Sequence, residues 1–337
     1  HDYILTAVSK NAPTVLLSQW FSIWNRPNLP PIHHNTIPGN GWRGHPLGIK
    51  LAWAQVQARR KLGVWKTRLL AGFADRGSIL RQYAKQIGFP ARELTEAYRF
   101  PPPLTYRTLP VISLTAWELE FPHAPRPNLF YVGPMVYAGR QESRPDSCAE
   151  KELEQIVKAK QKEGLKLIYC SVSTMEKEND AFLRRVVEAV SGRRDWILII
   201  GLGGLQKKGS FFEAVPDNVY AFEWAPQLQI LDHADCSINH GGIHTIHECI
   251  YFGVPMLIYS GKKFDQNGCA ARIAFHGLGV MADKDLEDAG MIRRRIEALL
   301  TDASFKTRVD EMNRRLRQQK GKLVKVVEGL LESQTSP

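Results

Sequence analysis

The sequence predicts an α/β protein of two domains, with a doubly wound parallel sheet in its second half. The chain has 337 residues, which is enough for two domains of roughly 150 residues each. Strands and helices that alternate at short intervals are typical of a parallel sheet covered by helices on both faces. The second half shows this alternation, with apolar runs at 165–171, 196–202, 234–238 and 254–259 and helical patterns at 179–191, 243–252 and 266–275.

The composition excludes several classes of protein. Apolar residues make up 44% and charged residues 23% of the chain, as in ordinary soluble domains. No run approaches the roughly 20 apolar residues that a membrane-spanning helix needs. The five cysteines are scattered and never form a C-x-x-C pair. We therefore exclude an integral membrane protein, a secreted mini-protein and a disordered chain, and we favour a reducing compartment over a disulfide scaffold or a thiolate zinc cluster.

The first half of the sequence predicts fewer helices and strands. Residues 1–11 are expected to form the end of a helix before Pro13, and residues 14–18 a buried strand. The pattern from 50 to 86 is mostly helical, and 109–115 resembles a strand. Because the chain opens at His1 within a helix–strand unit, we expect it to be a piece of a longer protein.

A boundary between domains is expected where the composition changes. Prolines are dense between 121 and 134, and a charged helix is predicted from 150 to 163. We therefore divide the chain into an N-terminal domain at 1–134, a linker at 135–149 and a C-terminal domain at 150–337. The last of these ends in a long charged helix from about 305 to 332.

The net positive charge of the chain lies almost wholly in its first half. Residues 1–149 hold 18 basic and 8 acidic residues, and the stretch 42–68 holds seven basic residues and no acidic one. This stretch also carries Trp42, Trp53 and Trp65. A basic helix with interfacial tryptophans can lie on an anionic membrane surface. The alternative is a solvated helical face with its tryptophans in the core. No recognition motif accompanies the charge, so a nucleic-acid partner is not expected.

The expected ligand site is the turn that follows the apolar run 234–238. In a doubly wound sheet, ligands bind beyond the carboxyl ends of the strands. Gly241 and Gly242 would let the backbone approach a ligand closely, and the helix after them offers free N–H groups and the positive end of its dipole. Thr245 could donate a hydroxyl bond to the same phosphate, and the carboxylate of Glu248 suits two vicinal hydroxyls of a ribose.

Two other interpretations compete for this turn. His240, His244 and His247 could bind zinc from one helix face, although the glycines would interrupt that helix after its first ligand. The two glycines could also form a structural turn without a ligand. The neighbouring motifs decide between these interpretations.

The ordered motifs around the turn resemble the nucleotide-sugar signature of the UDP-glycosyltransferases with the GT-B fold. They are W-x-x-Q from Trp224, H-G-G-x-x-T-x-x-E from His240, G-V-P from Gly253 and D-Q at Asp265 and Gln266. The chain looks closest to the bacterial enzymes that glycosylate macrolides, carotenoids and other lipophilic acceptors. The resemblance implies two Rossmann-like doubly wound domains facing a cleft, with the N-terminal domain incomplete here.

The resemblance also implies roles at the nucleotide. Trp224 would stack on the uracil and Gln227 would help to fix the nucleoside. His240 would contact the diphosphate, and Glu248 would hold the ribose hydroxyls. Further phosphate donors would come from Gly241, Gly242, Thr245, Ser173 and Thr174.

Asp265 and Gln266 would bind the hydroxyls of the transferred sugar. The alternative for Asp265 is simple capping of the helix that follows. The resemblance implies no metal and no cofactor beyond the nucleotide sugar as co-substrate. Family members use a histidine near the start of the N-terminal domain as the base, and nothing in residues 1–20 resembles that loop, so no catalytic residue is assigned.

The predicted activity is transfer of a hexosyl group from a UDP-sugar, or a TDP-sugar, to a hydroxyl of a lipophilic small molecule. The resemblance implies inversion at the anomeric carbon in a single displacement. Alternatives are a membrane-associated transferase that glycosylates a lipid carrier, and a nucleotide-sugar-binding fragment without catalysis. A sugar-nucleotide epimerase fits the W-x-x-Q and D-Q motifs less well. The expected location is cytoplasmic, with peripheral contact to the inner membrane surface through 42–68 as a further possibility.

Overall fold

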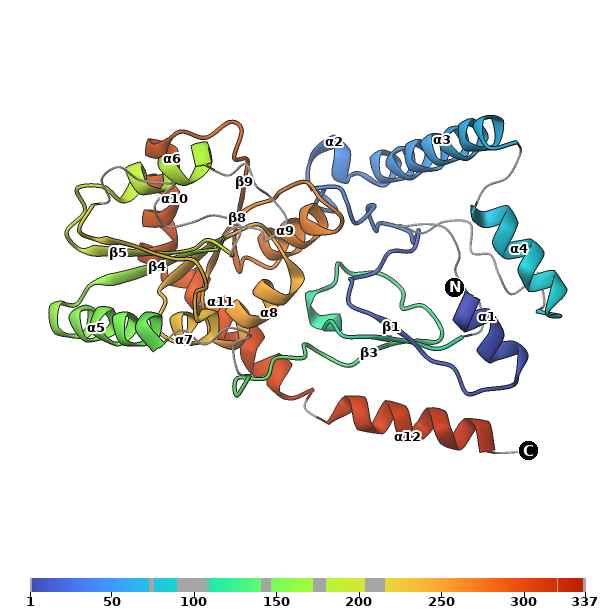
Figure 1. Cartoon of the computed structure of the whole chain (residues 1–337). Helices are drawn as coiled ribbons and strands as arrows, with labels where there is room; N and C mark the ends of the chain where they lie inside the picture. The colour runs from blue at the N-terminus through green and yellow to red at the C-terminus, as the bar shows by residue number, and fades with distance from the viewer. Residues whose placement is uncertain are drawn as a thin grey trace. The chain divides into compact units, whose positions relative to one another are not determined.

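The computed structural model describes residues 2–72, 76–89, 106, 109–140, 147–171, 180–203, 216–319 and 321–335. The chain forms two compact units (Figure 1). Unit 1 comprises residues 1–134 and 319–337, and unit 2 comprises residues 135–318. The sequence-based division assigned 319–337 to the second domain, whereas this segment groups with unit 1.

Unit 2 is built on a six-stranded parallel sheet, as the alternating apolar runs predict. The strand order is β6-β5-β4-β7-β8-β9. The strands are β4 (Lys166–Ser171), β5 (Trp196–Gly201), β6 (Val219–Phe222), β7 (Cys236–Asn239), β8 (Met256–Tyr259) and β9 (Gly279–Ala282). The chain runs outward from β4 to β6 and then returns to β7 on the other side of β4. The order of the strands therefore reverses between β4 and β7, which creates a topological switch point at their carboxyl ends.

Helices cover both faces of this sheet. In Figure 1, α6 and α10 lie on one side of the strands, and α5 and α7 lie on the other. The helices of unit 2 are α5 (Ser147–Glu163), α6 (Asp180–Val190), α7 (Gln227–Leu231), α8 (Ile243–Tyr251), α9 (Gln266–Phe275), α10 (Ala289–Thr301) and α11 (Ala303–Arg317). Because both faces are covered, nearly all residues of the central strands are buried, and β5 is apolar along its whole length.

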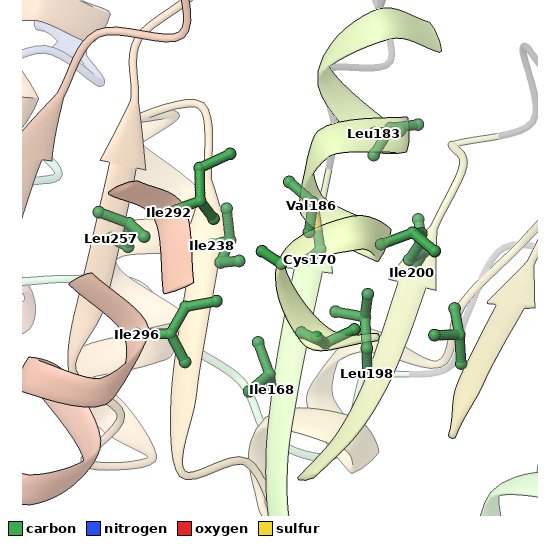
Figure 2. Close-up of a cluster of buried hydrophobic side chains, with 14 of the residues drawn as sticks. Ile168, Cys170, Leu183, Val186, Leu198, Ile200, Ile238, Leu257, Ile292 and Ile296 are labelled. Carbon is green, nitrogen blue, oxygen red and sulfur yellow. The ribbon is translucent and has the colours of Figure 1, made fainter. Parts of the chain in front are cut away.

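The main core lies between the sheet and the helices α6 and α10. Alternate residues of a strand point to opposite faces, so Ile168 and Cys170 of β4 face this layer together. Figure 2 shows them beside Leu198 and Ile200 of β5, with side chains of α6 packed over these strands, while side chains of α10 lie next to Ile238 and Leu257 of β7 and β8. These strand residues are all at most 1% exposed. Burial on this scale supplies the main driving force for folding of unit 2.

Unit 1 contains a smaller parallel sheet. Its strands are β1 (Leu16–Ser18), β2 (Val111–Ser113) and β3 (Leu129–Tyr131), in the order β1-β2-β3. The helix α1 (Asp2–Ser9) contacts α4 (Arg76–Gln86), and the hydroxyls of Thr6 and Tyr83 are 2.7 Å apart. The remaining elements are α2 (Gly41–Gly44), α3 (Pro46–Leu70), η2 (Trp117–Leu119) and α12 (Lys322–Thr335).

Three features of the fold differ from the sequence-based expectation. The edge strands β6 and β9 were not predicted, and β9 is mostly half buried, which weakens its apolar pattern. The single terminal helix expected at 305–332 is wrong. Two helices, α11 and α12, occupy that region, and Gly321 lies between them with φ of +85°, which is not helical.

None of the helices in the described part of the chain is long and apolar enough to cross a bilayer.

Two large-to-small substitutions in unit 2 should have very different effects on the free energy of unfolding, because one residue lies in the core and the other at the surface. Ile238 is 1% exposed within the core, whereas Leu286 is 78% exposed. We expect Ile238→Ala to lower the free energy of unfolding of unit 2 by roughly 3 kcal/mol, since the cavity adds to the lost burial. Leu286→Ala should change it by less than about 0.5 kcal/mol. Urea titration followed by hydrogen exchange of β4 and β5 measures both, and equal losses would contradict the assignment of the core.

Candidate functional site

The turn between β7 and α8 lies at the switch point of the sheet. β7 ends at Asn239, whose Oδ1 accepts a hydrogen bond of 3.0 Å from the backbone N–H of Gly241. Gly241 has a left-handed φ of +83°, and a Cβ there would lie 2.9 Å from the backbone oxygen of Gln266. Only glycine satisfies both conditions. The turn therefore packs directly against the start of α9.

The first turn of α8 presents backbone N–H groups beside polar side chains. Gly242 occupies the N-cap position, where it has no side chain to accept a hydrogen bond from these groups. A Cβ at Gly242 would meet Nε2 of His240 at 2.6 Å, so the imidazole lies close to the backbone of the turn. Thr245 is buried in this first turn. Amide donors, the positive end of the helix dipole and an imidazole thus meet at one place, which suits an anion such as a phosphate.

A chain of polar side chains lies one turn further along α8. The carboxylate of Glu248 is 5% exposed. Its Oε1 accepts a hydrogen bond of 2.8 Å from Nη1 of Arg140, and its Oε2 accepts one from Nε2 of Gln227. Oε1 of Gln227 in turn accepts a bond of 3.1 Å from the hydroxyl of Tyr169. Each carboxylate oxygen carries two lone pairs, so Glu248 can accept further bonds from a ligand.

An exposed tryptophan precedes Gln227 in the sequence. Trp224 lies in the turn between β6 and α7, three residues before Gln227, and it is 41% exposed. An indole at the surface of a polar site offers a flat apolar face with a polar edge. It could therefore stack on a planar ligand.

The loop between β8 and α9 is locally strained. Lys262 and Phe264 have φ of +59° and +47°, which side chains other than glycine rarely adopt. Asp265 follows at the N-cap position of α9, but its side chain does not cap the helix. Capping, the alternative raised from sequence, is therefore wrong. Burial raises the pKa of the Asp265 carboxyl, and its Oδ2 accepts a weak bond of 3.5 Å from Sγ of Cys269.

The structure brings most of the sequence-predicted residues to one edge of the sheet. Gln227 and Glu248 share a hydrogen bond, and the backbones of Gly241 and Gln266 are in close contact. Gln266 also accepts a bond of 3.4 Å from the backbone N–H of Lys263 through its Oε1. Ser173 and Thr174, the predicted phosphate donors after β4, lie outside the described residues.

Three residues of the site were missed by sequence reasoning. Arg140 lies in the predicted linker, where no motif marks it. Tyr169 lies in an apolar run that was interpreted only as a strand, although its hydroxyl is an unusual group for a buried position. Asn239 precedes the glycine turn, and asparagine before such a turn is a known signal for a side-chain bond to the backbone.

The histidines near the turn have different environments. His244 is exposed, whereas His247 is 4% exposed, and burial lowers the pKa of His247 to about 3. Within the described ranges, no three His, Cys, Asp or Glu side chains are grouped so that they could hold a metal ion.

A doubly wound sheet with a glycine turn at its switch point defines a Rossmann-like unit of the kind that binds nucleotides. Residues 186–326 match the family model for the C-terminal domain of erythromycin biosynthesis protein CIII-like proteins. The chain is also similar to an uncharacterized UDP-glucosyltransferase, YdhE, of Bacillus subtilis (strain 168), with 26% identity over 44% of the chain and 37% of the relative. It is similar to the zeaxanthin glucosyltransferase of Pantoea ananas, with 26% identity over 63% of the chain and 46% of the relative.

The fold has a counterpart among solved structures. The glycotransferase of kitacinnamycin superposes with a TM-score of 0.66 at 19% identity, over 98% of this chain and 73% of that one. The fold is therefore GT-B, and the predicted resemblance to the UDP-glycosyltransferases is confirmed. The chain aligns with less than half of the length of the two curated relatives.

The close contact at Gly241 predicts a loss of stability on substitution. We expect Gly241→Ala to lower the free energy of unfolding of unit 2 by about 1–2 kcal/mol for the left-handed backbone, with a further loss from the contact to Gln266. Gly192→Ala is the matched control, because Gly192 has φ of +76° and a Cβ there has open space. Urea titration should show a larger loss for Gly241→Ala, and equal losses would contradict the packing described here.

The burial of His247 predicts a pH dependence of stability. Its pKa of about 3 in the folded chain lies below the ordinary 6.5, so the unfolded chain binds the proton more tightly. The contribution of His247 to the free energy of unfolding is therefore nearly constant above pH 6.5 and falls as the pH drops below that value. We expect a loss of about 2 kcal/mol between pH 7 and pH 5 from this residue.

Two variants separate this effect from the other titrating groups. His247→Gln should reduce the difference between the unfolding free energies at pH 7 and pH 5. His244→Gln should preserve most of that difference. If both variants keep the full dependence, His247 does not titrate as its burial implies.

Proposed function

We propose that this chain carries the donor-binding and acceptor-binding units of a UDP-dependent glycosyltransferase. The observation that carries the proposal is the β7–α8 turn, where an anion site at the helix N-terminus is followed one turn later by the buried carboxylate of Glu248. Phosphate and ribose are linked covalently in a nucleotide, and this spacing offers a partner to each. The likeness to UDP-glucosyltransferases supports the same choice of donor.

The diphosphate would lie at the first turn of α8. The backbone N–H groups after Gly242 and the imidazole of His240 would donate to its oxygens, and the hydroxyl of Thr245 would add a further bond. Ser173 and Thr174 remain predicted donors from the segment after β4. Donors fixed in this way stabilise the negative charge that develops on the departing diphosphate.

The nucleoside would lie along the Trp224–Glu248 side of the turn. The indole of Trp224 would stack on the uracil, and the carboxylate of Glu248 would accept bonds from two ribose hydroxyls. Gln227 would hold that carboxylate in place through the bond that it already makes. A thymine base would stack equally well, so the choice between UDP and TDP is left to experiment.

The transferred hexose would lie toward the start of α9. Asp265 and Gln266 are both 8% exposed, and the side chain of Asp265 is not used to cap the helix. A carboxyl and an amide can together accept from and donate to neighbouring sugar hydroxyls. This would position the anomeric carbon for attack.

The proposed reaction is a single displacement. The oxygen of the acceptor hydroxyl attacks the anomeric carbon, the bond from that carbon to the diphosphate breaks, and the hydroxyl proton passes to a general base. UDP leaves, and the configuration at the anomeric carbon is inverted. The amides of α8 and His240 would supply the positive potential at the diphosphate, so the proposal includes no metal and no further cofactor.

A cavity in unit 1 supports a lipophilic acceptor. It has a volume of about 380 Å³, and its lining includes Trp20, Trp24, Val111 and Leu114. Arg126 is a charged residue of this lining, and it is held by Trp24, with its guanidinium carbon 4.6 Å from the ring centre, and by a bond of 3.2 Å to the carbonyl of Tyr106. Largely apolar walls with a few fixed polar groups are typical of small-molecule sites.

A cytoplasmic location fits this proposal. The described cysteines at 170, 236, 249 and 269 are buried and free. Unpaired thiols are usual in a reducing compartment.

Calorimetric titration of the chain with UDP, TDP and ADP tests the donor site. We expect UDP or TDP to bind more tightly than ADP. Loss of a charge-assisted contact to phosphate typically costs about 1.5–3 kcal/mol, so His240→Ala should weaken binding by roughly 10-fold to 100-fold.

The control is His233→Ala. His233 precedes β7 and therefore lies at the opposite end of that strand from the turn. Its replacement should leave binding unchanged. Equal effects of the two variants, or no nucleotide binding by the folded chain, would overturn the proposed donor site.

A further inference from the structure

We propose that the exposed face of α3 is a docking surface for an anionic lipid bilayer. This inference goes beyond the proposed glycosyl transfer and does not depend on it. The beginning of α3 is anchored in unit 1. Ile49 and Trp53 are buried near the beginning of this 25-residue helix, and Nε1 of Trp53 donates a bond of 2.7 Å to the carbonyl of Leu29. After Trp53, the described residues of α3 are half buried or exposed.

The exposed face carries an apolar stripe along the helix. Leu47, Leu51, Leu62, Trp65 and Leu69 are each between 50% and 65% exposed. At about 100° per residue, all five fall within roughly a quarter of the helix circumference. We call these five residues the α3 stripe.

The stripe lies opposite the buried side of the helix. By the same geometry, Ile49 and Trp53 lie roughly 180° away from it. Ala54 and Ala58 continue the stripe between its two ends, and both are exposed. Near its beginning the helix therefore has two apolar sides, of which one is buried in unit 1 and the other faces solvent, and beyond Trp53 only the exposed stripe continues.

Basic residues border the stripe on both sides. Lys50, Lys61 and Arg68 fall on one flank of the helix, and Arg59 and Lys66 fall on the other. No acidic residue occurs anywhere between 3 and 74. The positive charge of this surface is therefore not offset by acidic residues of the same segment.

An anionic bilayer surface can bind both the apolar α3 stripe and the basic residues that border it. Leucine and tryptophan side chains can enter the boundary between headgroups and acyl chains, while lysine and arginine reach the lipid phosphates. A second copy of this chain would bring like charges together. A nucleic acid would pair with the basic residues but would leave the leucines in water.

Flotation of the intact chain with lipid vesicles, without nucleotide, tests the proposal. We expect binding to vesicles of phosphatidylcholine with about 30% phosphatidylglycerol and much weaker binding to phosphatidylcholine alone. Raising the salt from about 0.1 M to about 0.5 M should lower the partition coefficient at least roughly tenfold. No binding to the anionic vesicles, or retention of duplex DNA with no vesicle binding, would overturn it.

Paired variants separate the stripe from other exposed apolar residues. Trp65→Ser with Leu69→Ser should reduce partitioning by roughly tenfold or more. The control is Val324→Ser with Leu331→Ser on α12, which are 57% and 54% exposed and should leave partitioning unchanged. Equal losses in the two double variants would contradict the assignment to α3.

A second pair tests the charges. Removing three basic residues from the flanks should lower partitioning by about 100-fold, since each contributes separately at an anionic surface. The matched control removes three exposed basic residues of unit 2. The test set is Lys61→Gln, Lys66→Gln and Arg68→Gln, and the control set is Arg184→Gln, Arg194→Gln and Arg314→Gln.

Quenching by brominated lipid gives a readout that does not depend on comparing affinities. Trp65 should be quenched when the chain binds vesicles whose acyl chains carry bromine near the headgroup. Trp65→Phe should remove most of this quenching while binding persists. Unchanged quenching in Trp65→Phe would show that another surface enters the bilayer and would overturn the proposal.

Discussion

The left-handed turn at Gly241 is the constraint on which the candidate site of unit 2 depends. The chain leaves β7, reverses at a residue with φ of +83°, and enters α8 so close to α9 that a Cβ would lie 2.9 Å from the carbonyl of Gln266. Asn239 holds the turn through its side chain. This one arrangement brings the start of α8 and the start of α9 close together. The candidate anion site and the candidate sugar-binding residues therefore share a single backbone contact.

The buried carboxylate of Glu248 imposes a second constraint. A charge that is 5% exposed needs partners, and Arg140 and Gln227 supply them from two different parts of unit 2. The bond from Tyr169 to Gln227 ties the same group to the central strand. Glu248 is thus fixed in position before any ligand arrives. Preorganisation of this kind reduces the entropy that ligand binding must overcome.

Sequence reasoning succeeded where burial is uniform and failed where it is not. The central strands were predicted because apolar runs such as Ile197–Ile200 are buried on both faces, and the glycine turn was predicted because its residues form a motif. The edge strand β9 was missed because it is only partly buried, and β6 was missed although three of its four residues are buried. The break at Gly321 was missed because a single glycine within a charged helical pattern is a weak signal. Arg140 was missed because its partner is 108 positions away in the sequence.

A crystal structure of the chain with UDP bound would test the central claim most directly. The account predicts that the diphosphate oxygens lie within hydrogen-bond distance of the amides at the start of α8, next to His240. It also predicts that the ribose hydroxyls contact the carboxylate of Glu248 and that the uracil stacks on Trp224. A nucleotide bound elsewhere on unit 2, with the β7–α8 turn unoccupied, would contradict the account.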